Sequence, residues 1–311
     1  MVLFRGTSDL DDCRGGIVAI GNFDGVHLGH QSMMAALRRQ ADAAGVPAVA
    51  MTFEPPPVEL LRPHAAPPRL MRLDRKAACL EAAGADCVLA LATDRPLLDL
   101  SADEFFREVL INQLAVRGLV EGQNFRFGRG REGDVSRLQS LCESSGLQLT
   151  IVEPVQIEGR TVSSSLIRQA VVAGELPEAA RLLGRPHEVI GIVERGADRG
   201  AGLGFPTANL SGTSTLLPPD GVYAARTEVD GCLYVTAVHL GANSTFGEED
   251  RKLEAHLLDF SGDLYGRRLR VELIDKVRET SRFESAAALV EQLQADCRRV
   301  RELVATASKS G

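Results

Sequence analysis

The stretch IVAIGNFDGVHLGH, residues 17–30, decides the fold of the first half of the chain. It begins with the apolar run Ile17 to Ile20, passes through the turn-forming run Gly21 to Gly25 and then becomes helical in pattern. A strand that leads directly into a helix leaves the first backbone N–H groups of that helix unpaired at the strand end. Such groups attract phosphate. The stretch therefore predicts a strand, a turn and a helix that together hold a nucleoside triphosphate.

Two histidines, His27 and His30, stand at the expected helix start. Residues three apart share one face of a helix, so both imidazoles could donate to one phosphoryl oxygen as charge builds there. Gly29 lets a ligand approach the backbone closely, and Gly21 and Phe23 of the preceding turn are further candidate binding residues. For the tetrapeptide alone, the alternative is a pair of partly exposed histidines without any ligand.

Strands and helices continue to alternate after this unit. Helical patterns end at Gly45 and Gly84, and a capping box from Ser101 to Glu104 begins another helix. The expected strands lie between these helices, at residues 46–53, 87–91, 119–121 and 147–152. This alternation predicts an α/β fold with a doubly wound, mainly parallel, Rossmann-like sheet, whose ligands bind beyond the carboxyl ends of the strands.

The pattern changes after Gly184, so we place a domain boundary there, with domains 1–184 and 185–311. The second domain consists of strands with few helices between them, and Asp230-Gly231 predicts a tight hairpin turn. One amphipathic helix closes the chain, with Leu289 and Leu303 near the ends of its apolar stripe. The expected strands are residues 189–193, 222–229, 233–240, 253–260 and 269–274.

Composition limits the classes of function. The chain has 311 residues and a net charge of -7, which argues against a general nucleic-acid surface. No segment has the apolar length of a membrane span or a signal peptide, so we expect a cytoplasmic protein with neither nucleic-acid nor membrane partners. The six cysteines show no metal or disulfide spacing and are expected to be free thiols. The oligomeric state does not follow from the sequence.

Two further segments have the residue types of phosphate sites. The loop from Asn124 to Arg131 combines glycines with arginines, which bind phosphates or stack on planar rings, although a solvated basic loop is an equal alternative. The segment from Arg160 to Arg168 places a serine cluster at a helix start. Simple N-capping would explain one serine there, but it explains three serines and two arginines less well.

These motifs resemble those of the prokaryotic bifunctional riboflavin kinase and FMN adenylyltransferase family, also called FAD synthetases. The resemblance extends from about Ile17 to Leu303, with the motifs in the order of the family. Two unrelated sets of motifs in one chain are more specific than either set alone. The motifs are residues 21–30, 124–128, 162–165 with Arg168, 204–209, 253–260 and 264–266.

For the first domain, the resemblance implies transfer of AMP from ATP to FMN, giving FAD and pyrophosphate. His27 and His30 would stabilise the α-phosphoryl transition state, and Asn124 would bind the nucleotide or its phosphates. Mg²⁺ would accompany the ATP. The residues implied to hold the pyrophosphate end are Arg160, Ser163, Ser164 and Arg168.

For the second domain, the resemblance implies a small antiparallel β-barrel with a C-terminal helix that phosphorylates riboflavin to FMN. Glu254 would be the general base, and Thr207 and Asn209 would be oxygen ligands of Mg²⁺. From periodicity alone, Glu254 reads as part of an ordinary half-exposed strand and residues 206–209 as a turn. The glycines implied to cover the ATP phosphates are Gly196, Gly200 and Gly204.

The chain departs from the family pattern at three positions. Pro56 replaces a usual histidine, Ala201 a frequent basic residue of the kinase glycine loop, and Ser244 a usual proline. None of them is one of the residues with an implied catalytic role. They could lower either rate or shift a loop without abolishing the chemistry.

Three other classes of protein remain open from the residues. An aminoacyl-tRNA synthetase would need a basic surface and a lysine-rich second loop, and residues 162–165 contain no lysine. A pantetheine-phosphate or nicotinamide-nucleotide adenylyltransferase would match the first domain only. A flavin or nucleotide sensor would bind the ligands without turnover, which an assay for FMN and FAD would reveal.

Overall fold

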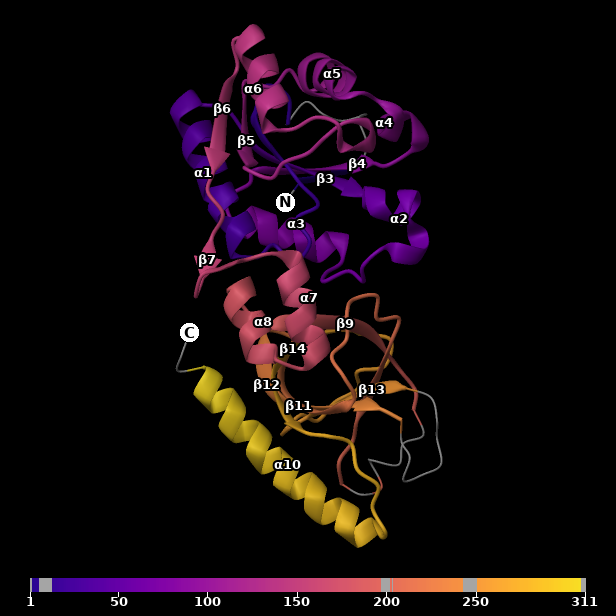
Figure 1. Cartoon of the computed structure of the whole chain (residues 1–311). Coiled ribbons are helices and arrows are strands. Elements are labelled where there is room, and N and C mark those ends of the chain that lie inside the picture. The colour runs from indigo at the N-terminus through magenta and orange to yellow at the C-terminus, as the bar shows by residue number, and fades with distance from the viewer. Residues whose placement is uncertain (1, 6–12, 197–201, 203, 243–250, 309–311) are drawn as a thin grey trace. The chain divides into compact units, whose positions relative to one another are not determined.

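The computed structural model describes residues 2–5, 13–196, 202, 204–242 and 251–308 (Figure 1). Packing divides the chain into two compact units. Unit 1 comprises Met1–Pro68 and Arg72–Ser163, and unit 2 comprises Arg69–Met71 and Ser164–Gly311.

Unit 1 is built on a parallel sheet with the strand order β1-β4-β3-β2-β5-β6. Helices cover both faces, with α1 and α3 on one face and α5 and α6 on the other (Figure 1). The strands are β1 (Val2–Arg5), β2 (Ile17–Ile20), β3 (Ala48–Glu54), β4 (Cys87–Ala92), β5 (Gly118–Gly122) and β6 (Gln148–Val152). The helices are α1 (Leu28–Ala44), α2 (Pro57–Leu61), α3 (Leu73–Ala82), α4 (Arg95–Asp99), α5 (Ala102–Phe105) and α6 (Val135–Ser144). Shorter elements are η1 (Pro63–Ala65), the π-helical η2 (Phe106–Gln113), η3 (Arg129–Arg131), and the hairpin of β7 (Gln156–Ile157) and β8 (Arg160–Thr161).

The predicted doubly wound sheet is confirmed, and local signals explain where its helices begin and end. Gly45 has the left-handed φ of 62° and donates its N–H to the carbonyls of Ala41 and Asp42, which ends α1. Ser101 and Glu104 form the expected capping box of α5. The strand β1, which pairs with β4 along the sheet edge, was not predicted.

The two central strands separate toward their carboxyl ends. β2 pairs with β3 along its whole length, from Ile17 to Ile20, but with β5 only at Ile17 and Val18. The chain continues from β2 to β3 and β4 on one side, whereas β5 and β6 lie on the other. This is a topological switch point, where parallel sheets bind ligands.

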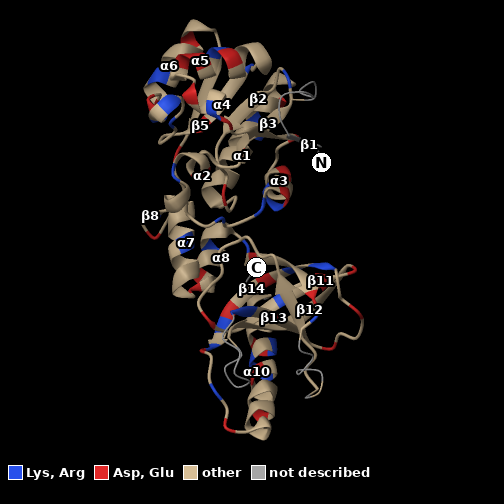
Figure 2. Ribbon diagram, turned by 90° about the vertical axis from the view of Figure 1, so that its right-hand side faces the viewer, with Lys and Arg blue, Asp and Glu red and all other residues tan. Residues whose placement is uncertain are grey.

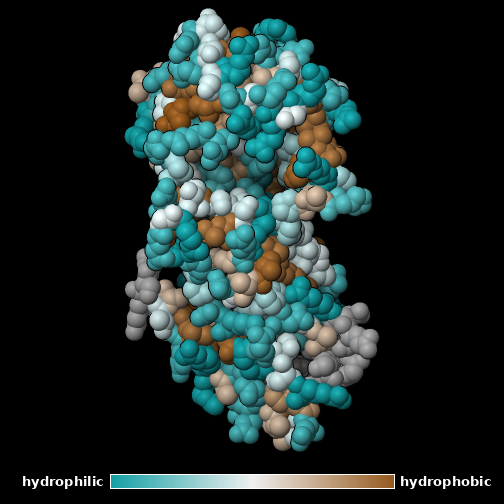
Figure 3. All heavy atoms as spheres, viewed as in Figure 1, coloured by the Kyte–Doolittle hydropathy of each residue, from teal (hydrophilic) through white to brown (hydrophobic). Residues whose placement is uncertain are grey.

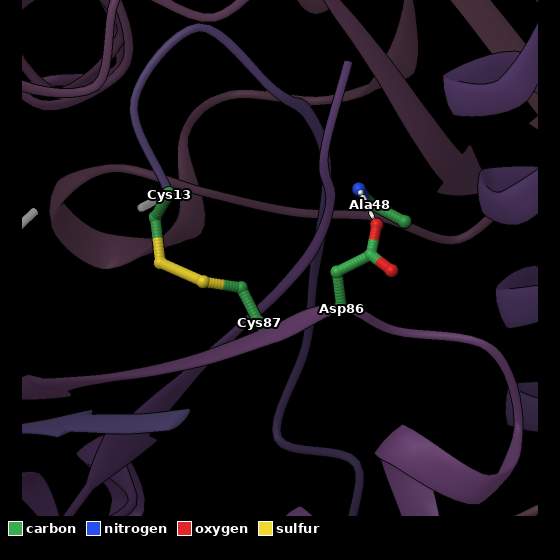
Figure 4. Close-up of a disulfide and its surroundings, with 4 residues drawn as sticks. All are labelled: Cys13, Ala48, Asp86 and Cys87. Atoms are coloured by element: carbon green, nitrogen blue, oxygen red, sulfur yellow. Dashed lines mark hydrogen bonds between the residues drawn. A yellow bond between two sulfur atoms is a disulfide. The ribbon is translucent and has the colours of Figure 1, made fainter. Parts of the chain in front are cut away.

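The expectation of free thiols is wrong for two cysteines. Cys13, which precedes β2, is bonded to Cys87 at the start of β4, with their Cα atoms 6.1 Å apart (Figure 4). The next residue back from Cys87, Asp86, accepts the N–H of Ala48 at 2.9 Å (Figure 4). The pairing joins residues 74 positions apart, so it follows from strand order and not from local spacing. The remaining cysteines are free: Cys79, Cys142, Cys232 and Cys297.

Unit 2 contains a closed antiparallel barrel with the strand order β10-β13-β12-β11-β14-β9. The expected hairpin between β11 and β12 is present, with positive φ at both Asp230 and Gly231. The strands are β9 (His187–Glu194), β10 (Ala208–Ser211), β11 (Gly221–Val229), β12 (Cys232–Gly241), β13 (Lys252–Leu257) and β14 (Arg268–Arg278). The helices of this unit are α7 (Ser164–Ala173), α8 (Leu176–Leu183) and α10 (Ala286–Ala307).

The barrel has a filled interior and a partly covered outer wall. Tyr223 and Val271 are fully buried inside it, whereas Ala224 and Ile274 on the outer wall pack against Val300 of α10. The burial of α10 supports the predicted amphipathic helix, whose inward face also includes Asp296, Val300 and Val304. On the barrel ribbons, basic and acidic positions are interspersed (Figure 2), and some pair across strands, as Arg226 does with Glu272 at 2.9 Å.

The boundary between the compact units differs from the domain boundary that the sequence pattern predicts at Gly184. Leu176 of α8 is fully buried in the same cluster as the barrel interior, so α7 and α8 pack in unit 2. The compact units therefore divide between Ser163 and Ser164. The division of activities near Gly184 stays a prediction.

The apolar side chains of the strands are largely buried, which leaves mainly polar side chains at the surface. The face drawn in Figure 3 is mostly hydrophilic. Among the described residues, no helix combines the length and apolar character that crossing a bilayer would require.

Candidate active sites

The first candidate site begins where β2 ends, at the switch point of the sheet. The N–H of Gly21 is bonded to the carbonyl of Met51 at 3.0 Å, which continues the pairing with β3 by one residue. The turn then takes left-handed conformations at Phe23 (φ 45°), Gly25 (φ 86°) and Val26 (φ 37°). Non-glycine residues rarely adopt such conformations, and they cluster at ligand sites.

The two histidines come together at the N-terminus of α1. His27 is the N-cap residue, only 6% exposed, and its Nδ1 accepts the backbone N–H of His30 at 3.4 Å. The two rings are stacked, with centroids 3.6 Å apart. Because Nδ1 of His27 is an acceptor, the neutral ring carries its proton on Nε2 and can donate to a ligand there. The expected pairing of the imidazoles is confirmed, although His27 precedes the helix rather than lying within it.

Two glycines lie close to neighbouring rings. A Cβ atom at Gly29 would lie 3.1 Å from Cε1 of His27, and one at Gly21 would lie 3.0 Å from the ring of Phe23. Phe23 itself is 1% exposed and meets His30 edge-on, with ring centroids 5.2 Å apart. The turn thus holds the imidazole of His30 against a buried aromatic ring.

The loop after β5 forms a cavity of about 380 Å³ in the same unit. Asn124 lies in its wall together with Arg126 and Arg131, and Arg126 also pairs with Asp134 at 3.4 Å. The whole lining consists of Gln123, Asn124, Arg126, Arg131, Asp134, Val135 and Ser136. Arg129, the third arginine of the loop, is exposed and is not part of this lining.

Backbone contacts hold this arginine loop in place. Phe127 and Gly133 exchange two hydrogen bonds, of 3.1 and 3.0 Å, and Phe127 is 6% exposed. Gly128 has a φ of 74°, and a Cβ atom there would lie 2.5 Å from the backbone nitrogen of Ala102. The backbone of the loop is therefore held against the rest of unit 1, whereas the side chains of Arg126, Arg129 and Arg131 are exposed.

The expected pyrophosphate residues are divided between the two units. In unit 1, Arg160 is exposed on β8, and the carbonyl of Val162 lies 3.8 Å from where a Cβ atom of Gly29 would be. The segment that leads to Ser163 therefore passes the N-terminus of α1. In unit 2, Ser164 begins α7 and Arg168 lies one turn further along it, as the sequence predicts.

The second candidate site lies on the outer wall of the barrel. In the strand register, Asn209 of β10 is directly opposite Glu254 of β13, and Glu254 is directly opposite His239 of β12. Residues directly opposite each other on neighbouring strands share a face. Burial alternates along β13 as expected, so Glu254 lies between the inward-facing Leu253 and Ala255.

Gly196, the first residue of the expected glycine loop, lies beside Asn209 of this row. A Cβ atom at Gly196 would lie 2.1 Å from Nδ2 of Asn209, so a larger residue would displace that amide. Thr207 immediately precedes β10 and is half-buried, and Gly204 has the left-handed φ of 86°. Gly200 lies outside the described residues.

Two contacts of His256 hold the segment around Thr207 against β13. Nδ1 of His256 lies 2.7 Å from the carbonyl oxygen of Pro206, and its ring meets Phe205 edge-on at 5.6 Å. His256 is two residues from Glu254 and shares its face of the strand. The segment that carries Thr207 is therefore fixed relative to Glu254.

Sequence reasoning missed two polar residues at these sites. Nδ1 of His239 lies 3.9 Å from Oε2 of Glu254, and burial lowers the pKa of this histidine although the nearby Glu254 opposes the shift. Glu121 is fully buried on β5, and burial holds its pKa well above the usual range. A charged residue inside the apolar strand run GLVEG was the available signal for Glu121.

Of the three departures from the family pattern, Pro56 lies within the described part of the chain. Pro56 is the N-cap residue of α2 and makes no side-chain capping bond. Ala201 and Ser244 lie outside the described residues.

Comparisons with known proteins point to two activities in one chain. Residues 10–166 match the family model described as FAD synthetase, and residues 183–304 match the family model described as riboflavin kinase. A curated bifunctional riboflavin kinase/FMN adenylyltransferase from Pseudomonas fluorescens is 41% identical over 307 residues, which is 98% of each chain. The protein of the same description from Escherichia coli K12 is 38% identical over 299 residues, or 95% of this chain and 96% of that one.

A solved structure has the same fold over almost the whole chain. It is titled macrolide-efflux protein from Streptococcus pneumoniae, and it covers 97% of this chain and 99% of its own with a TM-score of 0.86 at 30% identity. The efflux activity in that title refers to the protein from Streptococcus pneumoniae. The likeness to this chain is one of sequence and fold.

Proposed function

The chain belongs to the bifunctional riboflavin kinase/FMN adenylyltransferase family, and from that premise we propose that each reaction has a site of its own. The protein phosphorylates riboflavin to FMN with ATP and transfers AMP from ATP to FMN, which gives FAD and pyrophosphate. We assign AMP transfer to the switch point of the sheet in unit 1. Phosphorylation belongs to the outer wall of the barrel in unit 2, and the activities divide near Gly184.

AMP transfer needs positioning more than proton transfer. An oxygen of the FMN phosphate forms a bond to the α-phosphorus of ATP, and the bond from that phosphorus to the bridging oxygen of pyrophosphate breaks. The attacking phosphate is already an anion at neutral pH, so no base has to activate it. The protein has to align the reactants and neutralise charge. His27 and His30 do this by donating to α-phosphoryl oxygens as charge builds on them.

The remaining residues of this site hold the ends of the reactants. Asn124 and the arginines of its cavity bind at the nucleotide or at a phosphate, since guanidinium groups make strong charge-assisted bonds to phosphate oxygens. The segment before Ser163 passes the N-terminus of α1, which supports a role for it at the pyrophosphate. Within unit 1, Arg160 and Ser163 are assigned to that end, and the roles of Ser164 and Arg168 there stay predictions.

Phosphorylation of riboflavin requires a base. The terminal hydroxyl of the ribityl chain forms a bond to the γ-phosphorus of ATP, the bond from that phosphorus to ADP breaks, and the hydroxyl proton must leave. Glu254 accepts that proton. Its place between Asn209 and His239 on one face of the barrel wall supports this role.

The residues of the barrel wall fit a magnesium ion bound with ATP. Thr207 and Asn209 offer oxygen atoms, which Mg²⁺ prefers, and the ion usually keeps several waters. The absence of a side chain at Gly196 lets the Asn209 amide keep its present position. When bound, Mg²⁺ would supply positive charge that offsets the negative charge of the ATP phosphates. Thr207 and Asn209 would hold it on the protein side.

We also propose the cytoplasm as the location. Like this chain, the relatives from Pseudomonas fluorescens and Escherichia coli K12 are enzymes that use ATP and flavins. The disulfide between Cys13 and Cys87 is the observation that speaks against a strongly reducing compartment, where disulfides are rare.

The stacked pair of His27 and His30 carries the assignment of the first site, and the row of Asn209 and Glu254 carries the second. The test uses two assays on the purified chain, one with riboflavin and ATP and one with FMN and ATP, both with Mg²⁺. Products are separated by chromatography. His27→Ala should abolish FAD only, and Asn209→Leu should abolish FMN formation only. Loss of both products in either variant would contradict separate sites.

A further inference from the structure

Glu121 is a carboxyl group at the centre of unit 1 that neither reaction has used. It lies on β5 and is 0% exposed. Its Oε1 accepts the backbone N–H of Ile20, the last residue of β2, at 2.8 Å. Its Oε2 is also buried and has no hydrogen-bond partner within the described part of the chain. Such a group is costly to bury, so its place in the fold calls for an explanation.

The separation of β2 and β5 explains what the carboxyl group does. The N–H groups of Ile17 and Gly21 are bonded to Pro47 and Met51, on the β3 side of the strand. Alternation along a strand therefore turns the N–H of Ile20 toward β5. The backbone pairing with β5 has already ended at Val18, so no carbonyl of β5 is paired with Ile20. The side chain of Glu121 supplies the missing acceptor.

The bond anchors the strand end from which the phosphate site starts. Ile20 is followed directly by the Gly21 to Gly25 turn, which leads to His27 and His30. On the other strand, Glu121 is followed by Gly122 and then by the loop that contains Asn124. One hydrogen bond thus joins the starts of the two loops that form the first site.

We propose that Glu121 is a positioning residue of the adenylyltransferase site: its carboxyl group anchors the end of β2 and, through it, the loop that carries His27 and His30. The inference rests on the proposed location of AMP transfer at this switch point. Positioning of this kind affects rate strongly, because a displacement of about 1 Å at the reacting atoms can cost roughly 100-fold.

The protonation of the group fits this role. Burial raises the pKa of Glu121, and the hydrogen bond from the N–H of Ile20 opposes that shift only in part. The neutral acid is therefore favoured, with one oxygen accepting from Ile20 and the other carrying a proton. A neutral group places no negative charge under a site that binds polyphosphate. Glutamine reproduces this arrangement, since its carbonyl oxygen accepts and its NH₂ donates.

The test compares three variants of the full chain: Glu121→Gln, Glu121→Asp and Glu121→Leu. FAD formation from FMN is measured as kcat and KM for ATP, and FMN formation from riboflavin is measured in the same samples as a control for enzyme concentration. The urea midpoint of unfolding controls for the folding of unit 1. We expect Glu121→Gln to stay within about 2-fold of the wild type. Leucine has no acceptor and aspartate is one methylene shorter, so both should lower kcat/KM for FAD formation by roughly 10- to 100-fold.

A merely structural role would give a different result. It would lower the urea midpoint of unfolding and leave kcat/KM unchanged under conditions where the protein is folded. Wild-type kcat/KM in both Glu121→Asp and Glu121→Leu would overturn the inference, as would a loss in Glu121→Gln as large as in Glu121→Leu. If Glu121→Leu fails to fold, Glu121→Asp alone decides by the same criterion.

A further variant separates this inference from the proposed function. If His30→Ala retains full FAD formation, the location of the site itself is wrong. If His30→Ala loses FAD formation and Glu121→Asp does not, only the role of Glu121 is wrong.

Discussion

The two proposed sites differ in the groups that they present to ATP. Unit 1 presents donors, namely imidazoles and the N-terminus of α1, at the edge of a parallel sheet. Unit 2 presents the carboxyl group of Glu254 opposite Asn209 on the wall of an antiparallel barrel. The attacking groups explain the difference, since a phosphate attacks as an anion whereas a hydroxyl must first lose a proton. A base is therefore expected only in unit 2.

The largest expected effect comes from removing that base. Glu254→Gln should lower FMN formation from riboflavin by roughly 100- to 10,000-fold, because the amide cannot accept the hydroxyl proton. FAD formation from supplied FMN should remain within about 2-fold of the wild type, given that its nucleophile needs no base. Chromatography of the flavins measures both. Equal loss of the two activities would break the comparison.

The disulfide distinguishes the units in stability. Cys13 and Cys87 close a loop of 74 residues in unit 1, whereas Cys232 and Cys297 of unit 2 are free. Cys13→Ser should lower the free energy of unfolding of unit 1 by about 4 kcal/mol, because the cross-link restricts the conformations of the unfolded chain. Thermal inactivation with and without dithiothreitol measures it. We expect FAD formation to be lost at a lower temperature than FMN formation, and unchanged inactivation would contradict the prediction.

Removal of one imidazole tests the donor side of the comparison. His30→Ala should lower FAD formation by roughly 100- to 1,000-fold, because one donor to the developing charge is lost. Riboflavin should then be converted to FMN, which accumulates. A matched change outside the site is His64→Ala, on the exposed η1, which should leave both products unchanged. A fall in FMN formation with His30→Ala would exclude its restriction to one reaction.

The arginine loop offers a smaller and more selective test. Arg131→Ala should raise the KM for one reactant of FAD formation, ATP or FMN, by roughly 10-fold. This is the effect of losing one charge-assisted hydrogen bond. Arg129→Ala is the control, because Arg129 belongs to the same loop but does not line the cavity. Steady-state kinetics with ATP and FMN varied in turn shows which reactant Arg131 meets. Equal effects in both variants would point to general electrostatic attraction.

The smallest expected effect is a pH dependence of stability. The pKa of Glu121 is raised in the folded protein, so the folded state keeps a proton that the unfolded state releases. This group therefore favours folding most below its unfolded pKa, and that contribution is lost as pH rises. Glu121→Gln removes the dependence, so its urea midpoint relative to the wild type should be higher at pH 8 than at pH 5. An unchanged difference between pH 5 and pH 8 would show that Glu121 is ionised when folded.

Short-range signals predicted much of both units. The glycine at position 45, the capping box of Ser101 and the Asp230-Gly231 hairpin each depend on a few neighbouring residues, and the structure contains all three. The strand β10 was not predicted, because its segment has the composition of a turn and becomes a strand only by pairing with β9 and β13. The role of Pro56 and the glycine loop around Gly200 stay predictions.

Distant pairings could not be predicted. The bond between Cys13 and Cys87 and the contact of Glu121 with Ile20 join segments that are far apart in the chain. The alignment of His239 with Glu254 joins consecutive strands, but it depends on the register in which they pair. The packing of α8 against the barrel interior belongs to the same class.

The amino-acid sequence by itself determined the two classes of unit, the helix start with its two histidines and the residue types of each candidate phosphate site. These depend on periodicity and on residues close together in the chain. Only the tertiary structure decided that β2 and β5 separate above Val18, that a buried carboxyl group spans the gap, and which arginines face the cavity. The reason is physical: burial and hydrogen bonding between distant segments are properties of the packed chain, and local sequence does not contain them.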